Sequence, residues 1–320
     1  MMHRLLSFTA ALAVALLCSS ANAQFPSKPI RLLVPFPAGG AVDSASRVLA
    51  QAMSQALGQQ VVVDNRPGAD GAIAGGLLTK SAPDGYTLFF ASNTAMNAVP
   101  AMRKLPPYDP IADFTPVSMI GRIGIYLFVN RDLPVRTLAE LVGHARANPG
   151  KLNYGTGHAT SILATAQLMS LSKTSMMQVP YKGDGPVMTD LLGGRLHLSI
   201  ASPVPGVSLA REGKVRALAT LLPKRSPNLP DVPTMAEAGF PEYSLVAWGG
   251  LFGPAGLPRD VVERLSREVN SVLKRPEVIE ALARQNFEPE GSTPEEFAAF
   301  MKVQVDTWAR AVREAGIQPD

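Results

Sequence analysis

The sequence is poor in the residues on which many enzymes and metalloproteins depend. It has one cysteine in 320 residues, Cys18, and aromatic residues make up only 6% of the chain. A single cysteine excludes a disulfide within the chain and the usual cysteine-rich zinc sites. The chain also lacks a G-x-S-x-G elbow, an H-E-x-x-H pair and a Walker loop. These absences argue against the commonest hydrolases, metalloproteases and nucleotide-hydrolysing enzymes.

Strong charge is missing as well. The formal net charge is +4, from 30 Lys and Arg against 26 Asp and Glu. The basic residues are scattered and are not interleaved with aromatic residues, so no nucleic-acid partner is expected. A weak positive field of this kind would at most help anionic solutes to approach. Beyond the first residues there is no uncharged apolar run of transmembrane length, so no membrane-spanning helix is expected.

The N-terminus has the pattern of an export signal. Basic residues precede the apolar run Leu5–Leu17, and Ala21-Asn22-Ala23 is an A-x-A cleavage motif. We predict a signal peptide over residues 1–23, cleavage after Ala23 and a periplasmic location. Lipidation at Cys18 is the alternative, disfavoured because a leucine precedes this cysteine where a small residue is expected.

The most informative stretch follows this signal. Ile30–Val34 predicts a buried strand, Pro35–Gly40 a loop, and a helix is predicted to begin near Asp43. Such a turn aims unpaired N–H groups at one point and can hold an anion, and glycines let a ligand approach the backbone. An ordinary strand–helix turn is the alternative. The candidate contacts are Phe36, Ala38, Gly39, Gly40, Ala41 and Asp43, although Asp43 is better explained as the N-cap of its helix.

Along the rest of the chain, segments typical of buried strands alternate with segments whose apolar residues recur at helical spacing. This alternation predicts two α/β lobes. Two apolar segments, Val117–Asn130 and Tyr243–Gly253, are predicted to connect them. The expected division is therefore residues 24–122 plus 248–320 for lobe 1 and residues 123–247 for lobe 2. In such proteins a ligand binds in the cleft, at the carboxyl ends of the strands.

A resemblance to a known family runs along the whole mature chain. The matching segments occur in order: KPIRLLVPFPAGGAVD, LGQQVVVDNRPGADG, SAPDGYTL, YDPIADFTPV, ANPGKLNYG, VPYKG, DLLGG, GKVRALA, PDVPTMAEAGFP and STPEEF. Together they resemble the Bug family, the extracytoplasmic solute receptors related to tripartite tricarboxylate transporters.

This resemblance implies an α/β, two-lobed periplasmic binding protein of the Venus flytrap, type II-like kind, with the ligand cleft between its lobes. It implies a small ligand, a carboxylate, amino acid or amide-like molecule, and no cofactor. The membrane subunits of a tripartite transporter or a sensor protein are the implied partners, and the receptor is expected to be a monomer.

Further candidate contacts lie where other predicted strands end. Ser92 and Asn93 follow the strand Tyr86–Ala91, with local capping as the alternative. In lobe 2 the candidates are Thr156, His158, Thr160, Tyr181 and Ser202. The loop from Gly155 to Ser161 departs from the Gly-x-Gly-Ser pattern that the resemblance leads one to expect. His158 is therefore either a ligand contact peculiar to this chain or a solvent-facing loop residue.

A secreted hydrolase is the alternative function. It would pair the hydroxyl of Ser92 or Thr156 with His158, the one histidine near the predicted cleft. A metal site is not expected, because the remaining histidines of the mature chain, His144 and His197, are widely spaced. The sequence therefore favours a binding protein over an enzyme.

Overall fold

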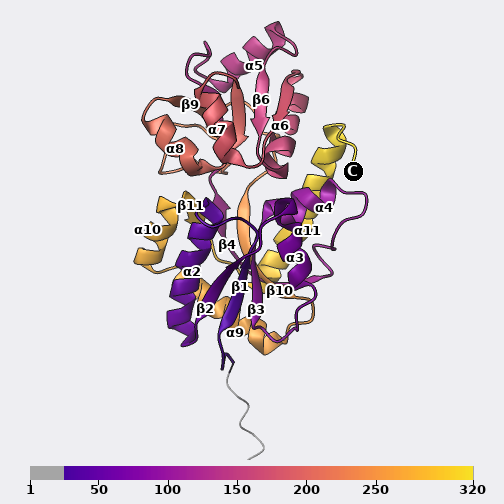
Figure 1. The fold of residues 1–320 in the computed structure, drawn as a ribbon, viewed down its shortest axis with the longest axis vertical. Helices are drawn as coiled ribbons and strands as arrows, with labels where there is room; N and C mark the ends of the chain where they lie inside the picture. The colour runs from indigo at the N-terminus through magenta and orange to yellow at the C-terminus, as the bar shows by residue number, and fades with distance from the viewer. Residues whose placement is uncertain (1–24, 320) are drawn as a thin grey trace, which may run out of the picture.

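The computed structural model describes residues 25–319. The predicted signal peptide, its cleavage site and Cys18 lie outside the described residues. The chain folds around two separate β-sheets, one above the other in Figure 1. We call the part built on the six-stranded sheet lobe 1, and the part built on the five-stranded sheet lobe 2. Among the described residues, no helix is long and apolar enough to cross a membrane.

The sheet of lobe 1 combines segments from both ends of the chain. Its order is β11-β4-β10-β3-β1-β2, in which β1, β2 and β3 run parallel and β10 runs antiparallel to β3 and β4. The strands are β1 (Ile30–Val34), β2 (Val61–Asn65), β3 (Thr87–Ser92), β4 (Phe114–Ile123), β10 (Trp248–Pro254) and β11 (Phe287–Pro289).

Helices cover both faces of this sheet because successive strand residues point to opposite sides. Leu32 packs with one set of helices and Leu33 with the other. The first set is α2 (Ala41–Leu57), α9 (Arg259–Val272) and α10 (Pro276–Arg284). The second set is α3 (Ala72–Leu78) and α11 (Pro294–Glu314), and the short turns of this lobe are η2 (Ala69–Gly71), η3 (Thr94–Ala98) and α4 (Val99–Ala101).

Lobe 2 repeats this plan on a smaller scale. Its sheet has the order β7-β6-β8-β5-β9. The strands are β5 (Tyr126–Asn130), β6 (Asn153–Thr156), β7 (Met177–Pro180), β8 (Leu198–Ala201) and β9 (Val215–Thr220). One face is covered by α5 (Leu138–Ala147) and α6 (Ala159–Ser172), and the other by α7 (Asp184–Leu192) and α8 (Pro203–Arg211).

The chain crosses between the lobes twice. It leaves lobe 1 between β4 and β5, at Gly124 and Ile125, and returns through the segment that ends at Ala247. The lobes also pack against each other between α11 and α6, where the buried Trp308 lies in one apolar cluster with Leu163. Figure 1 shows α11, in yellow, rising beside lobe 1 towards α6.

Candidate ligand-binding site

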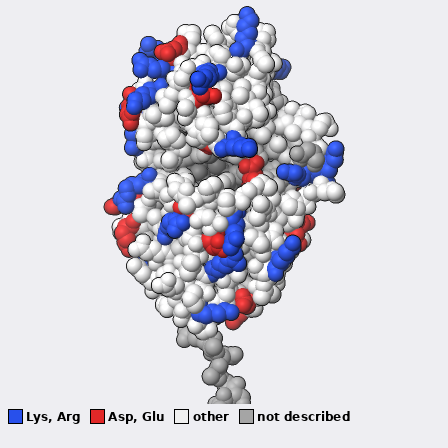
Figure 2. Space-filling model, in the orientation of Figure 1, with Lys and Arg blue, Asp and Glu red and all other residues white. Residues whose placement is uncertain are grey.

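A cavity of about 770 Å³ lies between the lobes, within the size range of small-molecule sites. Figure 2 shows the molecule hollowed across its middle, with charged side chains at the rim of the hollow. Lobe 1 lines it with the segments after β1, β2 and β3, and lobe 2 with those after β6, β7 and β8. The carboxyl ends of the parallel strands thus meet at one place, as is usual for open α/β sheets. The wall includes every predicted contact residue except Gly39 and Asp43.

The loop after β1 is held from behind by Asp43. Helix α2 has Gly40 as its N-cap, with extended backbone angles, so the prediction that Asp43 is the N-cap was wrong. Asp43 is the third residue of the helix, from where its Oδ2 reaches back to accept the N–H of Gly39 at 2.9 Å. Its Oδ1 accepts from Asn65 at 2.8 Å, and Arg47 donates to Oδ2 at 3.0 Å. Asp43 is thereby a support of the loop and does not line the cavity.

The charge of Asp43 is well compensated. Burial raises the pKa of this carboxyl, but the hydrogen bonds from Arg47, Gly39 and Asn65 outweigh it and hold the pKa below the usual value. Because Gly39 donates to Asp43, its N–H points at the protein and not at a ligand. The N–H groups of Gly40 and Ala41, at the start of α2, have no acceptor within the helix, and both residues line the cavity.

The residues after β3 connect the lobes. Asn93 Nδ2 donates to Thr160 Oγ1 at 2.9 Å, and the hydroxyls of Thr94 and Thr160 are 2.8 Å apart. All three side chains are buried. The side chain of Asn93 therefore does not cap the following turn, which was the alternative considered, but contacts Thr160 of the other lobe. Ser92 also lines the cavity, and its buried hydroxyl has no hydrogen-bond partner.

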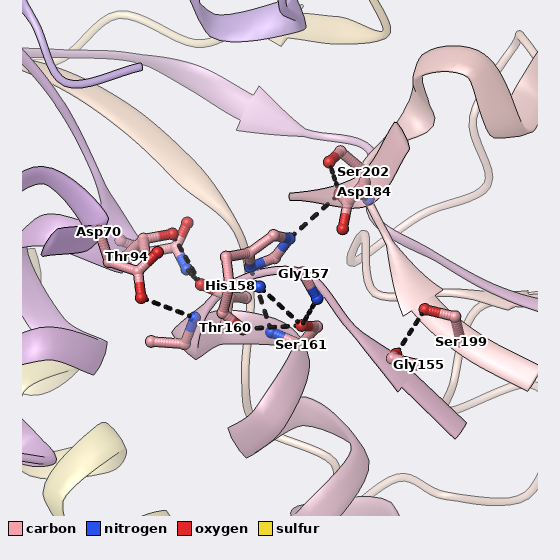
Figure 3. A network of polar contacts seen from close by, with 12 residues as sticks. Asp70, Thr94, Gly155, Gly157, His158, Thr160, Ser161, Asp184, Ser199 and Ser202 are labelled. Carbon is pink, nitrogen blue, oxygen red and sulfur yellow. Dashed lines mark hydrogen bonds and ion pairs between the residues drawn. The ribbon is translucent and has the colours of Figure 1, made fainter. Parts of the chain in front are cut away.

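His158 is the centre of a polar network in lobe 2 (Figure 3). It is the N-cap of α6, and its Nδ1 accepts the N–H of Ser161 at 3.2 Å. Its Nε2 lies 3.2 Å from Asp184 Oδ2, which also accepts the N–H of Ser202 at 2.9 Å and the hydroxyl of Ser202. The solvent-facing alternative for His158 was wrong, because the ring is enclosed between α6 and the start of α7.

Opposing effects set the charges of this pair. Burial raises the pKa of Asp184, but the charge and hydrogen bond of His158 and the hydrogen bonds of Ser202 lower it to about 2. Burial lowers the pKa of His158. The charge and hydrogen bond of Asp184, with a smaller contribution from the charge of Asp70, raise this pKa by more than burial lowers it, so the net shift is upward. The N–H of Ser161 opposes this shift by favouring an unprotonated Nδ1.

The contacts of His158 do not fit the role of a general base. Both ring nitrogens have protein partners, Ser161 and Asp184. The hydroxyl of Thr156 accepts from Gln178 Nε2 at 2.9 Å, and that of Ser92 has no hydrogen-bond partner. Neither predicted nucleophile is therefore hydrogen-bonded to the histidine, as a hydrolytic pair would require. Among residues 25–319 there is also no group of three or more His, Cys, Asp or Glu side chains placed to hold a metal.

The other predicted lobe 2 residues belong to the wall but are engaged with the protein. Tyr181 donates its hydroxyl to Asp190 Oδ2 at 2.7 Å. Ser202 is the N-cap of α8 and donates to Asp184. Lys182 lies at the edge of the cavity and is exposed.

Sequence reasoning missed two acidic residues and the apolar part of the wall. Asp70, in the turn η2, has φ of 54° and accepts the N–H of Ala159 at 3.2 Å through Oδ2. Asp184 is the first residue of α7. The only available signal for Asp70 was the Gly-Ala-Asp-Gly turn, which indicates a loop and no partner. The apolar wall residues not foreseen are Val42, Pro67, Ala69, Ile123, Ile125, Ile162, Pro180, Val204 and Ala247.

Comparison with known proteins identifies the family. Residues 45–317 match the sequence profile described as "Tripartite tricarboxylate transporter family receptor". The chain belongs to this receptor family. It is 38% identical to protein BugT of Bordetella pertussis over 296 residues, which cover 91% of this chain and 90% of BugT.

Solved structures agree with this assignment. One described as a periplasmic transporter is 40% identical, with a TM-score of 0.83 over 92% of this receptor and 100% of that chain. Rpa4515 of R. palustris, solved with adipate, is 34% identical, with a TM-score of 0.84 over 92% of this receptor and 100% of that chain. MatC of Rhodopseudomonas palustris, solved with malate, is 30% identical, with a TM-score of 0.80 over 90% and 100%. The receptor thus has the two-sheet α/β fold of periplasmic binding proteins.

Proposed function

We propose that this receptor binds one small carboxylate-bearing solute in the cavity between its lobes. The observation that carries the proposal is the cavity itself, into which the first turn of α2 brings the N–H groups of Gly40 and Ala41. A helix N-terminus favours a negative group through its partial positive charge and its unpaired donors. The adipate and malate in the two relatives are carboxylates as well.

In this proposal the two lobes move relative to each other when the ligand binds. Residues 24–122 plus 248–320 provide the anchoring loop, and residues 123–247 close over the ligand. The ligand binds unchanged, because the cavity holds no assembled nucleophile and base. We propose that the receptor acts as a monomer in the periplasm and needs no cofactor.

The proposed partner is the membrane part of a tripartite transporter, with a sensor protein as the alternative. Either partner would recognise the closed, liganded form. Pull-down from membranes with and without ligand distinguishes them, and recovery of neither class in a ligand-dependent way would contradict this part of the proposal.

The anchor is tested by Gly40→Val. Gly40 has an ordinary φ of −78°, and a Cβ there would meet nothing closer than the carbonyl oxygen of Pro37 at 3.8 Å. The fold is therefore expected to survive, while the branched side chain blocks the approach to the N–H groups. In isothermal titration with a panel of carboxylates, we expect affinity to fall by at least about 100-fold, the effect of losing roughly 3 kcal/mol.

Gly143→Val is the matched control, since Gly143 lies on α5 outside the cavity and a Cβ there meets nothing within 4 Å. It should bind like the wild type. Gly39 is a poorer test position, because its φ of 90° strains any side chain. Failure of every carboxylate to bind or thermally stabilise the wild type would contradict the proposed function.

A further inference from the structure

The lobe 2 side of the cavity already contains carboxylates that belong to the protein. We propose that the ligand of this receptor is a monocarboxylate with an apolar body, because Asp70 takes the position in lobe 2 where the second carboxylate of a dicarboxylate would bind. The inference rests on the proposed function and specifies its ligand class.

The first argument is the position of Asp70. Helix α6 points its N-terminus into the cleft, and its first N–H, that of Ala159, donates to Asp70 Oδ2 at 3.2 Å. The carboxylate comes from lobe 1, 89 residues away along the chain, and Asp70 lines the cavity. Figure 3 shows Asp70 reaching the loop around His158 from the opposite side of the cleft. The N-terminus of α6, where a ligand carboxylate of lobe 2 could bind, thus already has a carboxylate of the protein beside it.

The second argument is that the buried histidine of lobe 2 already has a carboxylate partner within the protein. His158 is paired with Asp184, whose side chain is only 7% exposed. Ser202 adds further donors to the same carboxylate oxygen, so the pair is held in place by the protein alone. A second ligand carboxylate at this end would face the carboxylates of Asp70 and Asp184, with only the exposed Lys182 as a cationic side chain not paired in the wall, and nearby like charges repel.

The third argument is the rest of the wall. Besides its polar residues, the wall has an apolar part to which both lobes contribute, through Pro67, Ile123, Ile125, Ile162, Val204 and Ala247. This apolar part gains free energy by covering hydrocarbon, whereas a charge placed against it would lose hydration. Lys182 is the one lysine of the wall, and it is exposed at the edge, where its charge is screened by water.

Matched pairs of ligands test the proposal. Hexanoate and adipate have the same chain length and differ by one carboxylate, and benzoate and terephthalate form an aromatic pair. We expect the wild type to bind at least one monocarboxylate at least about 10-fold more tightly than its dicarboxylate, as measured by isothermal titration. A dicarboxylate that binds as tightly as its monocarboxylate, or more tightly, in both pairs would overturn the inference while leaving the proposed function intact.

Variants of Asp70 test whether this residue causes the preference for a monocarboxylate over the matching dicarboxylate. Asp70→Asn removes the charge and keeps an oxygen for the N–H of Ala159, whereas Asp70→Gly removes the side chain and tolerates the positive φ. We expect the ratio of dicarboxylate to monocarboxylate affinity to rise at least about 10-fold in Asp70→Gly and less in Asp70→Asn. The ratio separates this effect from any general weakening of closure.

Asp306→Asn is the matched control, because Asp306 is an exposed residue of α11 outside the cavity wall and its replacement changes the net charge equally. Its affinity ratio should equal that of the wild type. An unchanged ratio in both Asp70 variants, with thermal unfolding showing that they are folded, would overturn the role of Asp70. Absence of binding by all four probes to the wild type would contradict the proposed function and this inference together.

Discussion

At the scale of single residues, His158 has the charge most sensitive to its surroundings. Asp184 and Asp70 both favour its protonated form, and the upward shift of its pKa places the titration above the ordinary value of 6.5. The stabilisation from the ion pair is therefore fully present below pH 6.5 and is lost as the pH rises through the raised pKa. The pair should stabilise the fold most under mildly acidic conditions.

His158→Asn tests this dependence, because asparagine can still cap α6 but carries no charge. We expect the melting temperature of the wild type to exceed that of the variant by the largest margin below pH 6.5, and the margin to shrink as the pH rises through the raised pKa of His158. Asp184→Asn removes the same pair from the other side and should flatten the profile in the same range. A margin that is constant or grows with pH would contradict the ion pair.

The sequence predicted residues that depend on their neighbours in the chain and missed those that depend on distant partners. Gly40 and Thr156 could be placed at strand ends from local patterns, and both line the cavity. Asp70 and Asp184 could not be found in this way, because their partners Ala159 and His158 lie 89 and 26 residues away. A carboxylate in a turn gives no indication of which N–H it will meet.

At the scale of secondary structure elements, α11 begins with a capping box. Thr293 Oγ1 accepts the N–H of Glu296 at 3.1 Å, and the Glu296 carboxylate accepts the N–H of Thr293 at 2.9 Å. Thr293→Ala should lower the free energy of unfolding in urea by about 1 kcal/mol, whereas Thr293→Ser should restore most of it. Equal stability of all three proteins would contradict a stabilising cap.

The boundaries of α2 show where local patterns are insufficient. Ala45, Leu49, Met53 and Leu57 are buried on one face, as their spacing predicts, and Gly58 ends the helix with φ of 68°. The start was placed too late, because an aspartate is the more familiar cap. Here Gly40 is the N-cap, and Asp43 lies in the first turn of the helix. The position of the Asp43 carboxylate depends on hydrogen bonds from Asn65 and Arg47, which the apolar spacing of the helix does not indicate.

At the scale of the whole molecule, Thr160 connects the lobes at the floor of the cleft. Thr160→Val removes a hydroxyl that serves Asn93 and Thr94, and each buried polar group left without a partner costs about 1–3 kcal/mol. The closed form should lose population, so we expect the apparent Kd of a bound carboxylate to rise about 10-fold or more. Small-angle scattering of the unliganded protein should show a larger radius of gyration.

Thr160→Ser keeps the hydroxyl and is expected to behave as the wild type in both measurements. If Thr160→Val had the radius of gyration and affinity of the wild type, these hydrogen bonds would have no part in holding the lobes together.

The contact between α11 and α6 gives the molecule an optical property. The chain has two tryptophans, and both are fully buried. Trp248 lies within the core of lobe 1, among Phe252 and Phe297, whereas Trp308 lies against α6 of lobe 2. A movement of lobe 2 that separates α6 from α11 changes the surroundings of Trp308, whereas the aromatic neighbours of Trp248 all belong to lobe 1. In a Trp248→Phe background, the tryptophan fluorescence, excited selectively over that of the tyrosines, therefore comes from the junction between the lobes, so the receptor carries its own unlabelled probe of closure.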